Sequence, residues 1–430
     1  MRRSSRSVRP PFSLPVSFHK LNMYALAAVA RIPGARLLVV LVILAFMPGA
    51  WAQSNYKTLH KFTGGADGGG VFGGLILDAA GNLYGTTGGG GANRDGTVFK
   101  LTPNTDGSWT EKVLHNFIYN QKDGIGPNGP LIFDQAGNLY GTTDGGGTSN
   151  WGTVFELTPN QDGTWSEKVL YSFLAGSDGG YPLAGLVFDA AGNLYGTTLI
   201  GGSGVGVVFK LTPKASGRWR EDVIYTFICC SNGIGPASGL VFDAAGDLYG
   251  TTNGGGVYNC GIVFELTPNQ DGTWSESVIH SFTGQDGSNP RSYLILDKAG
   301  NIYGTTPGGG FGQGVAFILT PKQDGTWTEK VIHHFNGMGQ GGQPYAGLTF
   351  DGVGNLYGTT RFGGAGYGVV FKLSPNSNGG WQETILHRFF DHPGAESYAS
   401  VIFDAAQNLY GTTGGDGVSK TFGSVFKITP

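Results

Sequence analysis

Seven aspartates occupy one position of a repeated motif, each shortly before a G-N turn or a variant of it. Loop carboxylates can hold calcium, but these loops lack the several carboxylates that a calcium cage uses. A turn aspartate instead accepts hydrogen bonds from the backbone amides that follow it. We therefore interpret them as turn residues and predict no metal site. The seven are Asp78, Asp134, Asp189, Asp243, Asp297, Asp351 and Asp404.

Five histidines share a second repeat position, at which Tyr171 and Tyr225 stand in two other copies. A metal ligand or a general base would not be replaced by tyrosine, so this position is predicted to serve packing. The histidines are His60, His115, His280, His333 and His387. No nucleophile elbow, H-E-x-x-H motif, phosphate-binding loop or dinucleotide fingerprint occurs, so we predict no catalytic residue and no cofactor.

Three cysteines depart from the repeat. Cys229 and Cys230 lie in one loop, and Cys260 lies in a later loop expected on the same face. In an oxidising compartment a disulfide from Cys260 to Cys230 or Cys229 is reasonable. Two alternatives stay open, namely three free thiols and pairing of the two adjacent cysteines.

A ligand site is predicted on glycine-rich loops that carry aromatic and polar side chains. Turn geometry demands no aromatic there, and rings beside carboxylates suit sugar binding by stacking and hydrogen bonds. The competing interpretation is that the rings pack the loops against each other. The predicted ligand-binding residues are Trp151, Tyr258, Phe311, Tyr367, Asp123 and Asp178.

The elements that would position these residues come from a repeat of 53 to 56 residues, marked by G-N-L-Y-G-T-T. Each copy contains, in order, an apolar strand A, strand B with the motif tyrosine, and strand C (V-F-K/E-L-T-P). The fourth element of the repeat is strand D (W-x-E-x-V-L-H-x-F). The tyrosines are Tyr84, Tyr140, Tyr195, Tyr249, Tyr303, Tyr357 and Tyr410.

Strand D follows strand C only six times, and the missing copy stands at residues 56–62. A closed ring explains this displacement, because an N-terminal strand can complete the last repeat. The sequence therefore predicts an all-β, seven-bladed β-propeller with four antiparallel strands per blade, closed by the N-terminal strand. Strand direction alternates, so the B-to-C and D-to-A loops should share one face.

The first 52 residues lie outside the repeat and resemble an export signal. Seven basic residues precede an apolar run over residues 37–47 and the sequence Ala50-Trp51-Ala52. That run is too short to span a bilayer, which needs about 20 residues, so we predict cleavage after Ala52 and a single domain over 53–430. A membrane anchor is the alternative interpretation. Met23 would be a second possible start that keeps the same cleavage site.

Removing that signal removes seven of 27 basic residues and none of the 30 acidic ones, which leaves 20 against 30 and a formal net charge of −10. An acidic chain without basic clusters argues against nucleic acid or anionic membrane as partners, since both require Lys and Arg. No further long apolar stretch follows. We expect a secreted monomer, periplasmic or extracellular, with no membrane span in the mature chain.

The motifs G-N-L-Y-G-T-T and G-T-V-F-K-L-T-P (Gly96 to Pro103) resemble the GloVer (Gloeo/Verruco) tandem repeat of choice-of-anchor exported bacterial proteins. The D-A-A-G-N-L-Y turn is more loosely similar to NHL and gluconolactonase-like propellers. The resemblance covers essentially all of the mature chain and implies export, but no established activity. The chain ends with its last repeat, so release into periplasm or medium is expected in place of surface anchoring.

These observations favour a non-catalytic binding protein that recognises an extracellular glycan or protein through the loop face. Two alternatives stay open. One is a propeller enzyme acting on polysaccharide, a lyase or glycosidase, with carboxylates that converge at the central funnel. The other is a purely structural repeat protein of the cell surface.

Overall fold

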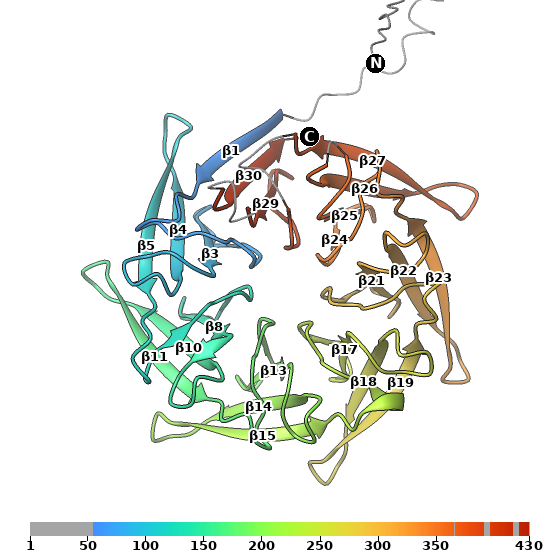
Figure 1. The fold of residues 1–430 in the computed structure, drawn as a ribbon, viewed down its shortest axis with the longest axis horizontal. Coiled ribbons are helices and arrows are strands. Elements are labelled where there is room, and N and C mark those ends of the chain that lie inside the picture. The colour runs from blue at the N-terminus through green and yellow to red at the C-terminus, as the bar shows by residue number, and fades with distance from the viewer. Residues whose placement is uncertain (1–54, 365, 391–395, 416–420, 430) are drawn as a thin grey trace, which may run out of the picture. The chain divides into compact units, whose positions relative to one another are not determined.

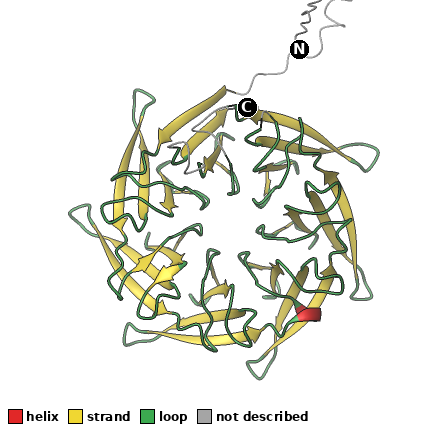
Figure 2. Ribbon diagram, in the orientation of Figure 1, coloured by secondary structure: helices red, strands yellow, loops and turns green. Residues whose placement is uncertain are grey.

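The structure is a computed structural model that describes residues 55–364, 366–390, 396–415 and 421–429. The predicted export signal and its cleavage site lie outside the described residues. Each repeat folds into one antiparallel sheet of four strands, because its apolar runs are separated by turn residues. The sheets stand in a ring, as Figures 1 and 2 show. Residues of all seven blades line a cavity at its centre, here called the central channel. The predicted seven-bladed all-β propeller is confirmed.

Blades are numbered along the chain, and each runs from its inner strand A to its outer strand D. Blade 1 consists of β2 (Ile76–Leu77), β3 (Leu83–Thr87), β4 (Thr97–Pro103) and β5 (Trp109–Asn116). Blade 2 consists of β7 (Ile132–Phe133), β8 (Leu139–Thr143), β10 (Thr153–Pro159) and β11 (Trp165–Ser172), and blade 3 of β12 (Val187–Phe188), β13 (Leu194–Thr198), β14 (Val207–Pro213) and β15 (Trp219–Thr226). Blade 4 consists of β16 (Val241–Phe242), β17 (Leu248–Thr252), β18 (Ile262–Pro268) and β19 (Trp274–Ser281), and blade 5 of β20 (Ile295–Leu296), β21 (Ile302–Thr306), β22 (Val315–Pro321) and β23 (Trp327–His334). Blade 6 consists of β24 (Thr349–Phe350), β25 (Leu356–Thr359), β26 (Val369–Pro375) and β27 (Trp381–Arg388).

Blade 7 is assembled from both ends of the described chain. It consists of β28 (Ile402–Phe403), β29 (Leu409–Thr413), β30 (Ser424–Thr429) and the N-terminal β1 (Asn55–Lys61). β1 pairs antiparallel with β30, so that Lys57 lies opposite Lys427. Lys57 Nζ also donates to the carbonyl of Gly107 in blade 1, as outer-strand lysines do between later blades. β1 therefore takes the place of a strand D.

The turn between strands A and B is held by the repeated aspartate. Asp78 accepts hydrogen bonds from the amides of Ala80 (2.9 Å) and Asn82 (2.8 Å), and from the Tyr84 hydroxyl (3.1 Å). Equivalent bonds recur in the other blades, so these carboxylates are turn residues as predicted.

The loop face is defined by contacts between the D-to-A loop that enters a blade and the B-to-C loop of that blade. Single antiparallel bridges join them in several blades, for example Gly69 with Gly89 and Ile234 with Gly254. In blade 2 the bridge extends into two short strands, β6 (Gly124–Ile125) and β9 (Gly145–Gly146). The two loop classes therefore share one face, as the alternating strand direction predicts.

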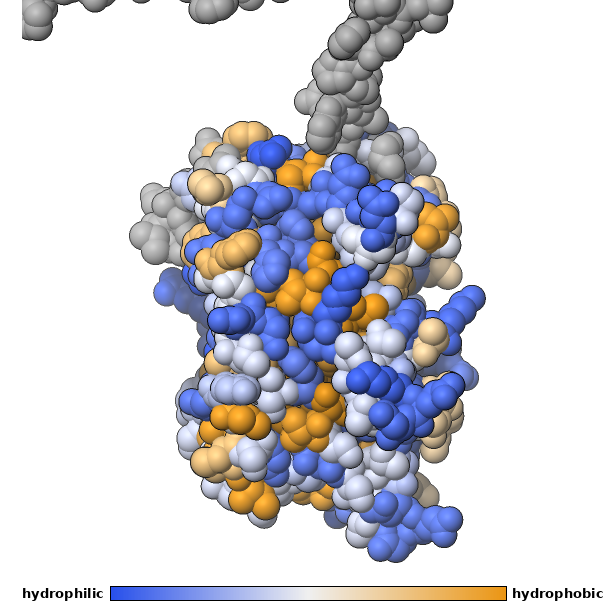
Figure 3. All heavy atoms as spheres, turned by 90° about the vertical axis from the view of Figure 1, so that its right-hand side faces the viewer, coloured by the Kyte–Doolittle hydropathy of each residue, from blue (hydrophilic) through white to orange (hydrophobic). Residues whose placement is uncertain are grey.

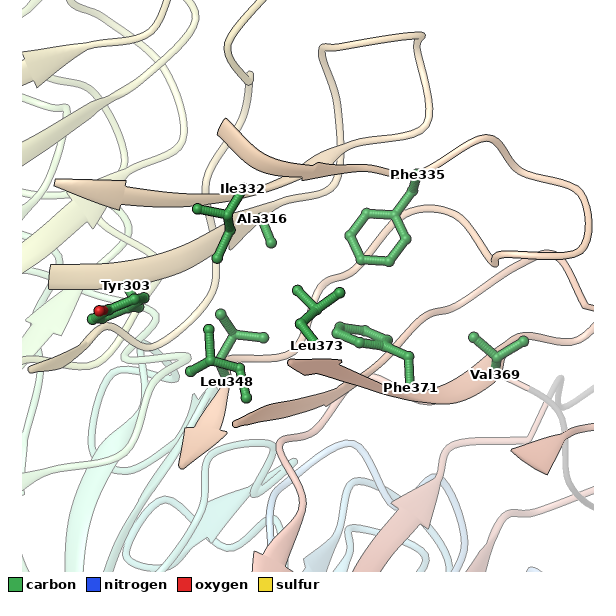
Figure 4. Close-up of a cluster of buried hydrophobic side chains, with 9 residues drawn as sticks. Tyr303, Ala316, Ile332, Phe335, Leu348, Val369, Phe371 and Leu373 are labelled. Carbon is green, nitrogen blue, oxygen red and sulfur yellow. The ribbon is translucent and has the colours of Figure 1, made fainter. Parts of the chain in front are cut away.

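The core lies between neighbouring blades. The phenylalanine that follows strand D packs on the strand C phenylalanine of the next blade, as Phe335 does on Phe371 with ring centroids 5.1 Å apart (Figure 4). Phe62, which follows β1, makes the equivalent contact with Phe99 of blade 1 at 4.9 Å. Along the rim, the outer strands present mostly hydrophilic side chains with apolar ones between them (Figure 3).

A ring of buried threonines links the blades nearer to the channel. The first threonine of each G-T-T donates to a carbonyl just before the inner strand of the next blade, as Thr142 does to Ala184 at 2.7 Å. The bond from Thr412 to Gly73, at 3.2 Å, joins blade 7 to blade 1. The other donors are Thr86, Thr197, Thr251, Thr305 and Thr359.

A second buried polar feature recurs near the rim, where the strand D glutamate of one blade faces the strand D ring of the preceding blade. Glu221 Oε1 is buried and has no hydrogen-bond partner among the described residues. Burial, assisted by the nearby charges of Asp178 and Asp222, raises the pKa of Glu221 to about 7. Burial likewise raises the pKa of Glu329 to about 7 and of Glu383 to about 8.

We therefore predict that Glu221→Gln stabilises the protein at alkaline pH. The raised folded-state pKa means that wild-type stability is present below the ordinary pKa of glutamate and is lost as pH rises through about 7. Glu221→Gln has no ionisable group at this position, so its stability does not fall in this way. After discounting for the partial exposure of this side chain, the free energy of unfolding of the variant should exceed that of the wild type by about 1 kcal/mol near pH 8. The difference should vanish near pH 5. Urea unfolding at both pH values measures it, and an advantage that is equal at the two would contradict the assignment.

Candidate binding site at the mouth of the central channel

The channel mouth is lined by one residue from each blade, four positions before its inner strand. These seven residues, here called the entry ring, all border a cavity of about 370 Å³. The ring has one aromatic wall with an arginine next to it, and small or polar residues elsewhere. Its members are Phe72, Asn128, Leu183, Ala237, Arg291, Tyr345 and Tyr398.

The aromatic wall crosses the point where the ring closes. Tyr345 of blade 6 and Tyr398 of blade 7 have ring centroids 5.6 Å apart, and Phe72 of blade 1 meets Tyr398 at 5.4 Å in an edge-on contact. The wall is therefore built from residues near both ends of the described chain. It can form only because the ring closes.

A charged pair stands beside this wall. Arg361 directly follows the G-T-T motif of blade 6, and Glu396 lies in the loop that enters blade 7. Arg361 Nε is 3.3 Å from Glu396 Oε2. The guanidinium carbon is 4.5 Å from the ring centroid of Phe362, 5.4 Å from that of Tyr398 and 5.9 Å from that of Tyr345. Aromatic faces on this scale attract a cation, so Arg361 is fixed in place.

Tyr398 is bound to the same carboxylate. Its hydroxyl donates to Glu396 Oε2 at 2.6 Å. Burial raises the pKa of Tyr398, and this hydrogen bond to Glu396 raises it further. The phenol therefore keeps its proton at neutral pH and presents a hydrogen-bond donor, not a base.

Blade 2 has a carboxylate at the position that Arg361 occupies in blade 6. Asp144 follows the G-T-T motif there and accepts a hydrogen bond from Asn128 Nδ2 at 2.8 Å. Burial raises the pKa of Asp144 to about 6, although that hydrogen bond opposes the shift. Asn128 Oδ1 is buried and has no hydrogen-bond partner among the described residues.

Tyr293 obstructs the channel behind the entry ring. The other blades have Gly, Pro or Ser at this position, two residues before the inner strand. The Gly185 amide of blade 3 donates to the Tyr293 hydroxyl at 2.5 Å. The Tyr293 side chain therefore extends from blade 5 to blade 3. A Cβ built on Gly239 of blade 4 would lie only 1.9 Å from Tyr293 Cε1. The tyrosine thus narrows the channel behind the cavity.

The aromatic residues predicted from the sequence lie elsewhere on the loop face, and none borders the cavity. Trp151 is half-buried and packs edge-on against Tyr181 at 4.9 Å, while Tyr367 is partly buried against a core cluster. Tyr258 is 60% exposed and Phe311 is 75% exposed. Only Tyr258 and Phe311 present much of their surface to a ligand.

The predicted aspartates are both buried and are bonded within their own loops. Asp123 lies 3.1 Å from His115 Nε2 and accepts from the Gly124 amide at 2.7 Å. Asp178 accepts from the Leu174 amide at 2.8 Å and from the Tyr171 hydroxyl at 3.1 Å. These contacts also show why histidine and tyrosine alternate at that strand D position, since either ring can bond the loop aspartate.

The three cysteines are free thiols in the structure, and the disulfide from Cys260 to Cys230 or Cys229 stays a prediction. Within the described ranges, no group of three His, Cys, Asp or Glu side chains could hold a metal ion. In the same part of the chain, no helix is long and apolar enough to cross a membrane.

Comparison with known proteins identifies the repeat. The sequence profile described as the Gloeobacter/Verrucomicrobia repeat matches residues 48–202, 110–313 and 236–430. No curated protein sequence matches the chain.

The chain is similar to solved structures at low sequence identity. The extracellular domain of a proposed one-component system from B. thetaiotaomicron is 14% identical, with a TM-score of 0.53 over 87% of this chain and 41% of that one. An ancestral GH74 enzyme is 12% identical, with a TM-score of 0.49 over 82% of this chain and 55% of that one. The chain thus spans about two fifths and just over half of these two proteins.

We predict that Gly239→Ala is more destabilising than Gly74→Ala, its equivalent in blade 1. The new methyl group would collide with the Tyr293 ring in blade 4, whereas the nearest atom in blade 1 is Pro130 Cβ at an ordinary 3.6 Å. Overpacking of this kind costs about 1–3 kcal/mol, so thermal unfolding should separate the two variants clearly. Equal stability of the two would show that Tyr293 does not cross the channel.

Proposed function

The chain belongs to the Gloeobacter/Verrucomicrobia repeat family, and from that premise we propose that it is an exported, non-catalytic protein that binds carbohydrate at the mouth of its central channel. The observation that carries this proposal is the aromatic wall beside the Arg361–Glu396 pair. Other blades have different residues at the same positions, so these side chains are not needed for the fold to repeat.

The chemistry of this wall matches that of a sugar. The faces of pyranose rings are apolar and stack on aromatic side chains, while their hydroxyl groups bond carboxylates and guanidinium groups. Phe72, Tyr345 and Tyr398 line a cavity of about 370 Å³, which is within the usual range for small-molecule pockets. Arg361 lies against the rings of Tyr345 and Tyr398, and Glu396 accepts a hydrogen bond from Tyr398. Arg361 and Glu396 hold each other in position, so little side-chain freedom is lost on binding.

The same groups are poorly arranged for proton transfer. The raised pKa of Tyr398 keeps its phenol protonated, and Glu396 is already engaged by Tyr398 and Arg361. A general base needs a free proton-accepting site near neutral pH. This cluster therefore supports recognition in preference to catalysis.

One observation favours a second candidate, a propeller enzyme that acts on polysaccharide. The pKa of Asp144 is raised to about 6 by burial, and a carboxyl group of this kind can act as a general acid. Turnover of polysaccharide that is abolished by Asp144→Asn would favour this candidate over simple binding.

We predict that a glycan array probed with the purified protein identifies ligands whose binding depends on the channel mouth. Tyr345→Ala should weaken binding about tenfold or more, the equivalent of about 1.4 kcal/mol, because it removes a stacking surface. Tyr345→Phe should retain most of the affinity. Val353→Ala serves as the control, since Val353 is 84% exposed on an A-to-B turn of the opposite face.

Trp151→Ala and Tyr258→Ala test the outer loops that the sequence indicated. Loss of binding in these variants but not in Tyr345→Ala would move the site outward on the loop face. Absence of both binding and turnover would overturn the proposal in favour of a structural surface repeat.

A further inference from the structure

Cys229 and Cys230 are adjacent in the chain, and their sulfur atoms are 2.9 Å apart. Both residues adopt left-handed backbone conformations, with φ of 42° and 71°. Such conformations cost free energy for residues other than glycine and persist only where the surroundings impose them. Both side chains are exposed, so a small thiol or disulfide can reach them.

The neighbouring loop fixes this conformation. The Gly256 amide of the B-to-C loop donates to the Cys230 carbonyl at 2.6 Å, and the short 3-10 turn Cys230–Asn232 follows directly. The Tyr225 hydroxyl accepts a hydrogen bond from Asn232 Nδ2 at 2.6 Å, which ties the end of the turn to strand β15. The pair is therefore held in place where the chain passes from blade 3 into blade 4.

Cys260 is held in a separate environment. Its thiol contacts the Tyr258 carbonyl at 3.4 Å, and a Cβ built on Gly284 would lie 3.6 Å from its sulfur. It packs against the buried cluster between blades 4 and 5. No group of three metal-binding side chains forms around it in the described ranges.

We propose that Cys229 and Cys230 form a disulfide between adjacent residues, which makes the loop face of blade 4 a redox-responsive modification site. The oxidant is a small-molecule disulfide. A thiolate of the pair attacks it and releases one of its halves as a thiol. The second cysteine then displaces the other half as a second thiol, so that one S–S bond forms in the protein and one is lost in the reagent. The two protons of the protein thiols end on the two reagent thiols. Thiolates do the attacking, so closure is faster at alkaline pH.

This disulfide is readily reduced, because its geometry is strained. Adjacent Cα atoms are about 3.8 Å apart, whereas bridged cysteines are usually about 4.4–6.8 Å apart. Strained and exposed disulfides have the more oxidising potentials that characterise labile sites. The proposal does not depend on carbohydrate binding, so failure of one leaves the other standing.

The test is to count thiols by mass spectrometry after incubating the native protein with glutathione disulfide, removing the reagent and alkylating under denaturing conditions. We expect one alkylated cysteine, Cys260, before reduction and all three after it. A peptide containing Cys229 and Cys230 should weigh two hydrogens less before reduction. Cys260→Ser should leave no alkylated cysteine before reduction. Cys229→Ser should prevent the loss of two hydrogens.

Three alkylated cysteines after oxidation, or a bond that includes Cys260, would overturn the proposal. Lability is tested separately by native titration with mixtures of reduced and oxidised glutathione. The pair should open in mixtures that leave an unstrained structural disulfide closed. A pair that resists all such mixtures would overturn the redox-responsive role.

Discussion

The structure depends on one repeated contact between neighbouring blades. Each blade must bond to the next in the same way, so that the seventh blade meets the first and the ring closes. Buried threonine hydroxyls supply part of this link near the channel, and paired phenylalanine rings supply it farther out. An unsatisfied hydroxyl or a displaced ring would be costly at any of these positions, because each is fully buried. The glycine-rich motif G-N-L-Y-G-T-T therefore recurs with little variation. Residues outside these contacts are free to differ between blades.

That freedom is used at the mouth of the channel, on the side where the ring closes. Phe72 comes from the first blade, while Tyr398 and Glu396 come from the last, so this part of the site exists only after the chain ends have met. Departures from the repeat occur here and at Tyr293, a position at which the other blades have Gly, Pro or Ser. The proposed site and the closure of the ring thus share the contact between Phe72 and Tyr398.

The sequence could predict the ring but not the site. The seven motif copies and the displaced strand at residues 56–62 determine the blade number and the closure, because only an N-terminal strand can complete blade 7. Loop aromatics such as Trp151 attract attention in the sequence, but whether a ring packs or projects depends on neighbouring loops, and Trp151 packs on Tyr181. The entry ring was missed because the residue type at this position changes between blades, so no shared motif marks it. An alignment of the seven copies at that position would have shown Tyr345, Tyr398 and Arg291 as departures.

Closure by β1 is the claim on which the site depends most directly, and a disulfide trap measures it. In a background where the native cysteines are serine, Lys57→Cys and Lys427→Cys place two thiols at directly opposed positions of β1 and β30. Pairing of β1 with β30 predicts rapid, nearly complete cross-linking within the monomer under mild oxidation. Lys57→Cys with Lys372→Cys, the equivalent of Lys427 in blade 6, should give none. Absence of the first cross-link, or equal yield of both, would show that the N-terminal strand does not complete the last blade.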